Sequence, residues 1–120
     1  MKLTAEKKLL TAALSRIQGI TEKTSIKPVT SQALIKTHGD MLMIAATNLQ
    51  IGIQETYKKI TVAEEGAVAV NARMLFDIVR EMPEGLISIE EKENYTIEIN
   101  SGKKVKFKIS GSSPEDFPQL

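Results

Sequence analysis

A helical pattern that occurs twice is the feature of this sequence that most constrains its fold. Each copy has four apolar residues spaced i, i+3, i+4 and i+7, which places them on one face of a helix. A shift of 65 residues relates the two apolar stripes, which are Leu10, Ala13, Leu14 and Ile17, and Leu75, Ile78, Val79 and Met82. The predicted helices span residues 5–18 and 72–82. Gly19 is expected to end the first helix, and Asn71 to cap the second through its side-chain oxygen.

The segments that flank the helices have the patterns of β-strands. Strands are predicted before the helices at 2–4 and 67–70, and after them at 33–35, 41–46, 49–53, 86–90, 95–99 and 105–109. Residues 57–62 either extend one strand or begin a connection. We therefore predict an α+β fold made of a duplicated βαβββ unit, with both helices packed on one face of an antiparallel sheet. The repeats would cover about residues 1–62 and 66–110. The alternative to a duplication is that the two helices match by chance at four apolar positions.

Length and composition exclude several classes of protein. The chain has 120 residues, no cysteine and one histidine, so we expect one domain without disulfides, thiolate zinc sites or a multi-histidine metal centre. A formal charge of +1 excludes a chain that is basic over its whole surface, but one basic face is compatible with it. The longest apolar run, 41–46, is too short for a bilayer, and the N-terminal segment lacks a signal-peptide pattern. A cytoplasmic protein, or a domain of one, is expected.

The sequence has no arrangement typical of catalysis. It lacks a glycine-rich phosphate loop, a nucleophile elbow and a zinc-binding helix motif. His38 falls in a predicted turn, and the paired glutamates at 64–65 and 90–91 would point to opposite faces of an extended strand. We expect a protein that is not an enzyme and that uses neither a metal nor a cofactor.

Two surfaces are candidates for binding. Arg73 and Arg80 lie opposite the buried stripe of the second helix, about 10 Å apart along its axis, and could contact DNA phosphates without reading bases. The alternative is that they are simply solvated, as charged residues on the outer face of a helix usually are, since Asp77, Glu81 and Glu84 dilute the basic charge of this helix. Lysines alternate with apolar residues over 103–109, which is typical either of a solvated sheet edge or of an edge that pairs with another protein.

Four segments carry a resemblance over the whole chain. They are MKLTAEKKLLTAALSRIQG at 1–19, TNLQIGI at 47–53, VNARMLFDIVREMPEG at 70–85 and DFP at 116–118. Together they resemble the first of three domains of the bacterial sliding clamp, the beta subunit of DNA polymerase III. The resemblance implies the DNA clamp fold. It also implies a non-catalytic processivity factor, which is a subunit of a holoenzyme whose activity is that of a DNA-directed DNA polymerase, a nucleotidyltransferase.

The resemblance also implies partners. Two three-domain chains would form a head-to-tail homodimer that encircles double-stranded DNA, and the replicative polymerase and clamp loader would bind through domains outside these residues. The alternative is a stand-alone clamp-like protein-interaction domain that does not encircle DNA. The isolated 120-residue chain is expected to be monomeric or weakly associated and to bind DNA poorly.

Site residues follow from the same resemblance and from helix geometry. The expected DNA contacts are Arg73, Arg80, Lys8, Arg16 and Lys23. Thr24 occupies the position where relatives often present an arginine to DNA, and Lys23 or Lys27 is expected to replace it. The expected dimer-interface residues are Lys104, Lys106, Phe107, Ile109 and Met74. Met74 stands where relatives often have a basic residue, so one ion pair of that interface is expected to be absent.

Overall fold

The computed structural model describes residues 1–21, 31–102 and 105–118. The first half contains β1 (Lys2–Glu6), α1 (Lys7–Ile17), β2 (Gln32–His38), β3 (Met41–Thr47), β4 (Gly52–Tyr57) and β5 (Thr61–Glu64). The second half contains β6 (Gly66–Asn71), α2 (Ala72–Glu81), β7 (Leu86–Glu91), β8 (Thr96–Ser101) and β9 (Val105–Ser110). The α+β class and the duplicated order of strand, helix and strands are confirmed.

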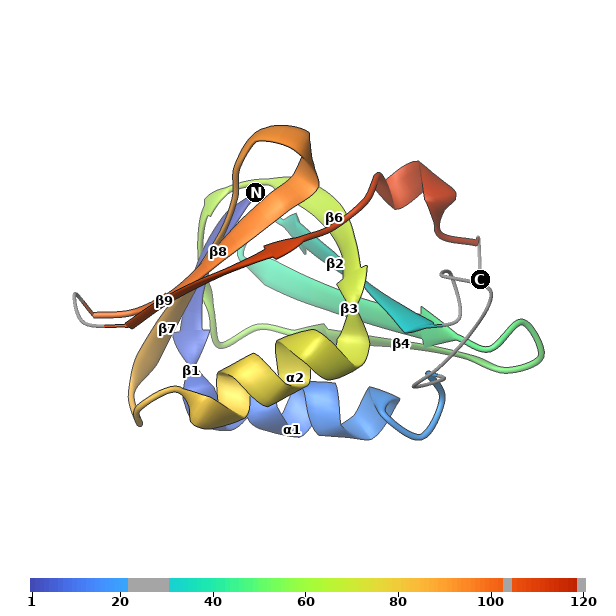
Figure 1. The fold of residues 1–120 in the computed structure, drawn as a ribbon, viewed down its shortest axis with the longest axis horizontal. Helices are drawn as coiled ribbons and strands as arrows, with labels where there is room; N and C mark the ends of the chain where they lie inside the picture. Colours follow the sequence, from blue (N-terminus) through green and yellow to red (C-terminus); the bar gives the residue numbers. More distant parts are fainter. Residues whose placement is uncertain (22–30, 103–104, 119–120) are drawn as a thin grey trace.

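The strands form two antiparallel sheets, where the sequence analysis expected one. One sheet has the order β5-β1-β7-β8-β9 and the other the order β4-β3-β2-β6. The first strand of each half therefore pairs with strands of the other half, β1 with β7 and β6 with β2. Both helices lie side by side below the sheets (Figure 1). A short periodic strand specifies its faces but not its neighbours, so the exchange could not be predicted from periodicity.

Each half ends with a segment that covers the open edge of its own first strand. After β4 the chain returns as β5 and pairs with β1, with Leu3 opposite Val62. After β9 it returns beside β6, where Ser112 and Ala69 form an isolated bridge. The outer strands are therefore β5 and β9 in the first sheet and β4 and β6 in the second, and β6 is bridged by the C-terminal segment at Ala69.

One core lies between the helix pair and the two sheets. The helices contribute the predicted stripes, of which Leu10, Leu14 and Leu75 are almost completely buried. The sheets contribute alternate residues of their strands, such as Leu42, Ile44 and Ala46 in β3 and Ile87 and Ile89 in β7. Burial of these aliphatic side chains is the main term that stabilises the fold, at roughly 25 cal/mol for each Å² of apolar surface removed from water.

The predicted helix ends agree closely with the structure. The Asn71 Oδ1 accepts a hydrogen bond of 2.8 Å from the backbone N–H of Met74, so the predicted cap of α2 is confirmed. Helix α1 begins differently, because Glu6 at its N-cap makes no side-chain cap bond. Helix α1 ends at Ile17 with Gln18 as its C-cap, and Gly19 follows without the left-handed conformation expected of a glycine that ends a helix.

The prediction of a strand over 49–53 is wrong in its first part. Leu49 and Ile51 alternate with polar residues, but they lie in a turn between β3 and β4 and are 51% and 58% exposed. The Thr47 hydroxyl accepts from the backbone N–H of Leu49 and donates to the carbonyl of Ile51. The Asn48 side chain accepts from the N–H of Ile51 as well. These local bonds compete with a strand ladder and hold Leu49 at φ 78°.

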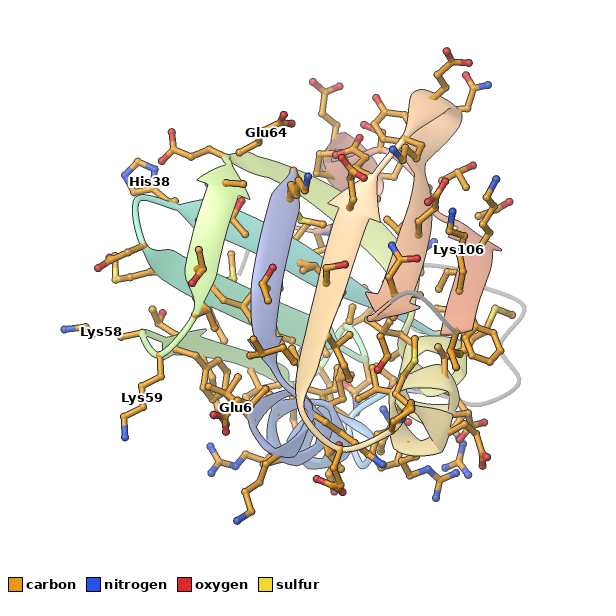
Figure 2. All side chains as sticks on the ribbon, turned by 90° about the vertical axis from the view of Figure 1, so that its left-hand side faces the viewer. Glu6, His38, Lys58, Lys59, Glu64 and Lys106 are labelled. Carbon is orange, nitrogen blue, oxygen red and sulfur yellow. The ribbon has the colours of Figure 1, made fainter. Side chains whose placement is uncertain are left out.

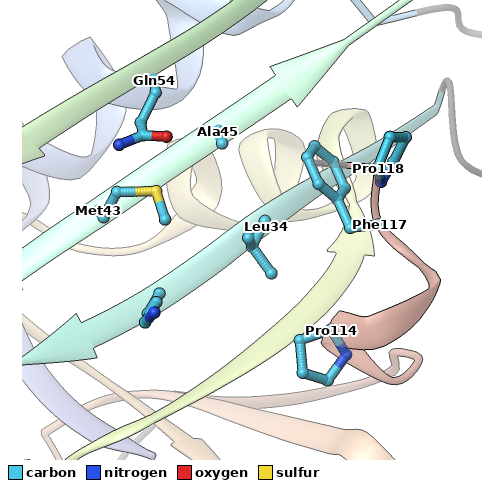
Figure 3. Close-up of a pocket in the computed structure, with 8 residues that line it drawn as sticks. Leu34, Met43, Ala45, Gln54, Pro114, Phe117 and Pro118 are labelled. Carbon is cyan, nitrogen blue, oxygen red and sulfur yellow. The ribbon is translucent and has the colours of Figure 1, made fainter. Parts of the chain in front are cut away.

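The C-terminal segment packs against the outer face of the second sheet. It forms a short 3₁₀ helix, Pro114–Asp116, and then places Phe117 in a buried position. Phe117 and its neighbouring prolines line a shallow pocket of about 290 Å³ over β2, β3 and β4 (Figure 3). The apolar walls of the pocket include Leu34 and Met43. The C-terminal segment is therefore anchored by one aromatic side chain.

Candidate nucleic-acid interface

The two helices form an antiparallel pair that is held together at both ends. The Lys7 ammonium at the start of α1 donates to the carbonyls of Arg80 (3.0 Å) and Met82 (2.7 Å) at the end of α2. At the other end, the Gln18 amide donates to the carbonyl of Ala72 at 3.2 Å. The last carbonyls of a helix lack partners within the helix and carry partial negative charge. A lysine ammonium at that end supplies both hydrogen bonds and a positive charge. This layer presents one face away from the sheets.

The exposed face of α2 holds its two arginines through one carboxylate. Asp77 lies 3.2 Å from the Arg73 Nε and 2.6 Å from the Arg80 Nη2. The Phe76 ring lies under both guanidinium groups, with centroid distances of 4.7 Å to Arg80 and 5.9 Å to Arg73. Partial burial tends to raise the pKa of Asp77, but the hydrogen bond from Arg80 and the two positive charges outweigh it and lower that pKa. Asp77 is therefore a charged partner that compensates one of the two arginine charges.

The exposed face of α1 carries less charge than the sequence analysis expected. Lys8 is exposed, and in the described residues it has no ion-pair partner. Arg16 points instead toward β4, where its Nη1 lies 2.6 Å from the Glu55 Oε2. The Tyr57 hydroxyl donates to the same oxygen at 2.6 Å. Arg16 is thus a strut between α1 and β4, and its charge is compensated within the chain.

This cluster shifts two pKa values. Hydrogen bonds from Tyr57 and then from Arg16 lower the pKa of Glu55. Burial, followed by the bond to Glu55, raises the pKa of Tyr57 to about 12. Both shifts favour the bonded arrangement of a neutral phenol, a carboxylate and a guanidinium, so the strut is stable at neutral pH.

The outer edge strand β9 shows which of its residues are accessible. Phe107 is 36% exposed, but Ile109 is 8% exposed and packs in the core. The ammonium groups of Lys106 and Lys108 each lie 3.6 Å from Glu98 on β8, and Met74 on α2 is 49% exposed. Of the apolar side chains expected at an interface, Phe107 and Met74 are therefore available, and Ile109 is mostly used by the domain itself.

Two expected site residues, Lys23 and Lys104, lie outside the described residues, as does Lys27. Arg73 and Arg80 are brought together on one face, whereas Arg16 is directed to β4. The capping role of Lys7 and the pairing of both arginines with Asp77 were not predicted from the sequence. The second could have been found, because Asp77 is spaced i+4 from Arg73 and i−3 from Arg80, the spacings at which helical side chains meet.

Within the described ranges, no group of three or more histidine and acidic side chains is placed to hold a metal ion. His38 forms a contact of 3.2 Å with Glu65 at the exposed end of β2. Among the helices that the structure describes, none is long and apolar enough to cross a membrane. The arrangement that the structure does provide is a helix face with guanidinium groups, which can bind phosphates.

Comparisons with known proteins agree on one family. The model of the DNA polymerase III beta subunit, N-terminal domain, matches residues 1–120. The beta sliding clamp of Chlamydia pneumoniae is 28% identical over 120 residues, which cover 100% of this chain and 32% of that protein. The solved structure of Caulobacter crescentus pol III beta has a TM-score of 0.92 and 29% sequence identity to this chain. The match includes 100% of this chain and 32% of that one.

A further structure shares the fold at lower identity. The Helicobacter pylori beta clamp bound to a DNA ligase peptide has a TM-score of 0.93 and 22% identity, with 100% of this chain covering 33% of it. The chain thus spans about a third of the length of these relatives. The resemblance inferred from the sequence is confirmed: the chain belongs to the DNA polymerase III beta subunit family and matches its N-terminal domain.

Proposed function

We propose that this chain is the first of three domains of a sliding-clamp subunit, and that two such subunits close head to tail into a ring around duplex DNA. The ring would tether the replicative polymerase to its template in the bacterial cytoplasm. Such tethering needs weak phosphate contacts without base readout, because tight or specific contacts would stop sliding. The observation that carries the proposal is the helix face with Arg73 and Arg80, taken with the family match over the whole chain.

Asp77 is expected to weaken the contact between the two arginines and a DNA phosphate. A DNA phosphate that binds Arg73 or Arg80 must compete with a carboxylate already within hydrogen-bonding distance of both. An Asp77→Asn variant keeps the shape of the side chain and removes its charge. We expect it to bind duplex DNA several-fold more tightly at low salt, as measured by fluorescence anisotropy. Unchanged or weaker binding would show that Asp77 does not compete with phosphate.

The proposed subunit contact uses β9. Phe107 and Met74 supply exposed apolar surface, and Lys106 faces outward beside Glu98, so the partner edge should carry both apolar and acidic side chains. The proposed polymerase and clamp-loader contacts lie in the other two domains. A DNA ligase peptide bound to the Helicobacter pylori clamp suggests that short peptides are the form in which such partners dock.

A topological experiment tests the proposal. The native protein would be loaded on circular duplex DNA by its clamp loader, washed with high salt, and followed after the DNA is cut once. A ring should resist salt on the circle and leave after linearisation, since its link is topological. Arg73→Glu/Arg80→Glu should reduce loading, whereas the control Lys36→Glu, on the outer face of β2, should not.

A stand-alone interaction domain is the second candidate, favoured by the exposed Phe107 on an edge strand. It would give the same retention on circular and linear DNA, and its partner binding would survive charge reversal at Arg73 and Arg80. The mass of the native protein in its source cells separates the two candidates further. About three times the mass of this domain is expected for a ring subunit.

A further inference from the structure

A second basic region lies beside the helix layer, in the turn between β4 and β5. Lys58 and Lys59 form this turn and are exposed. The backbone N–H of Ile60 donates to the carbonyl of Lys58 at 2.9 Å, which fixes the turn, and Ile60 packs against the core. Figure 2 shows both lysines extending away from the body of the domain on the side next to α1, with Lys59 directed toward the level of the helices. The turn is therefore anchored while its charges are free to meet a ligand.

Lys8 joins these lysines from the first turn of α1. Lys8 and Lys59 line one hollow of about 360 Å³, together with Glu6 and Leu9. Lys58 and Lys59 also line an adjacent hollow against β1 and Leu86. We define Lys8, Lys58 and Lys59 as the lysine patch. Glu6 is the one acidic residue that lines these hollows, so the patch has a net positive charge.

The lysine patch differs from the other basic residues near the helices in how its charges are satisfied. Arg73 and Arg80 are bound by Asp77, and Arg16 by Glu55. Lys7 is bound by carbonyls of α2 and lies 3.8 Å from Glu84. No carboxylate of residues 1–21, 31–102 or 105–118 comes within 4.0 Å of the ammonium groups of Lys8, Lys58 or Lys59. These three therefore gain more from an external anion than the arginines do.

The position of the patch continues the arginine face. Because Lys7 bonds to the carbonyl of Arg80, the start of α1 and the end of α2 lie at the same end of the helix layer. Viewed from that end in Figure 2, α2, α1 and the Lys59 turn follow one another across the domain. Arg80, Lys8 and Lys59 thus come from three neighbouring elements at one rim. A polyanion crossing this rim would meet all three.

We propose that the lysine patch is a second phosphate-binding surface, which contacts the DNA backbone where the duplex passes the end of the helix layer. The inference rests on the proposed function, because it takes the helix face to be directed toward DNA. Duplex DNA is favoured over an acidic protein because the patch adjoins the arginine face and its three ammonium groups have no carboxylate partner within the described ranges.

The test is a salt series with one double variant and a matched control. Binding of the purified protein to a fluorescein-labelled duplex would be measured by anisotropy from low to moderate salt. Lys58→Gln/Lys59→Gln should weaken binding several-fold at low salt. It should also reduce the slope of log K against log salt by up to about 1.8, because each lost phosphate contact removes about 0.9. Lys36→Gln, on the outer face of β2, should change neither quantity, and thermal melting would verify that all variants fold.

A third variant separates failure of the patch from failure of the proposed function. If Arg73→Gln/Arg80→Gln weakens binding while Lys58→Gln/Lys59→Gln does not, the lysine patch is overturned and the clamp proposal stands. If neither variant weakens binding, both proposals fail. If the lysine variant instead abolishes binding of an acidic protein and leaves DNA binding unchanged, the patch is a protein-docking surface and the inference is wrong.

Discussion

Helices α1 and α2 occupy equivalent places in the two halves but differ on their exposed faces and at their ends. Both bury the same stripe of apolar residues. Outside that stripe, α2 carries the arginines and Asp77, whereas α1 presents the small side chains of Ala12 and Ser15 beyond Lys8. Helix α2 is capped by Asn71, and α1 has no side-chain cap. The need to pack keeps the apolar stripes alike, whereas the exposed faces are free to differ. The exposed face of α2 carries the charged side chains, and α1 supports α2 through Lys7.

The strongest test of the comparison concerns the matching stripes. Leu10→Ala and Leu75→Ala each remove a side chain that is almost completely buried, so each should destabilise the domain by about 2–5 kcal/mol. Urea unfolding followed by circular dichroism gives these values. Met74→Ala, on the exposed face of α2, is the control and should have a small effect. A large difference between the two leucine variants would show that the helices are not equivalent in the core.

A smaller effect is expected where α1 supports α2. Lys7→Met keeps a long side chain but loses both hydrogen bonds to the last carbonyls of α2, and should cost about 1–2 kcal/mol. Lys8→Met is the control, since Lys8 makes no such bonds in the described residues. Chemical denaturation of both variants measures the difference. Equal stability of the two would mean that the Lys7 bonds contribute nothing.

The N-caps give a test of similar design. Asn71→Ala removes the bond to the Met74 N–H and should destabilise the domain by about 1 kcal/mol. Glu6→Ala, at the equivalent position of α1, removes no cap bond and should have little effect. Comparison of the two midpoints of thermal unfolding reveals the asymmetry. Similar losses in both variants would contradict it.

The smallest expected effect is a pH dependence of stability that arises from the contact between α1 and β4, through Arg16 and Glu55. The pKa of Glu55 is lowered in the folded state by Tyr57 and Arg16, so its contribution to stability is present at neutral pH. It is lost as the pH falls below the ordinary glutamate value of 4.5 and through the lowered pKa. Glu55→Gln should therefore flatten the acid limb of the stability curve.

The exposed Glu93→Gln serves as its control and should leave that limb unchanged. Urea midpoints measured over a series of acidic pH values give the comparison. An unchanged acid limb in Glu55→Gln would show that the Arg16–Glu55 strut does not contribute to stability.

The sequence predicted best those features that depend only on the local spacing of apolar and polar residues. The stripes of both helices, the Asn71 cap and most strands follow from local spacing, so they could be predicted. The pairing of β1 with β7 could not, because it depends on which distant strands meet. The direction of Arg16 depends on Glu55, 39 residues away, and has no local signal. The strand predicted at Leu49 and Ile51 was wrong because the turn chemistry of Thr47 and Asn48 outweighs the alternation of apolar and polar residues there.

The exchange of first strands between the halves has a consequence for how such a chain could arise. A single βαβββ unit would pair its first strand on one side only, with its own last segment, and the other side of that strand would have no partner. Its remaining strands would form a separate sheet whose inner edge, at β2 or β7, is uncovered. Two separate copies could complete each other only as a domain-swapped dimer, whose stability depends on concentration. Joining the copies in one polypeptide makes that association intramolecular. The domain is thus organised as a tethered dimer, in which neither half is expected to persist without the other.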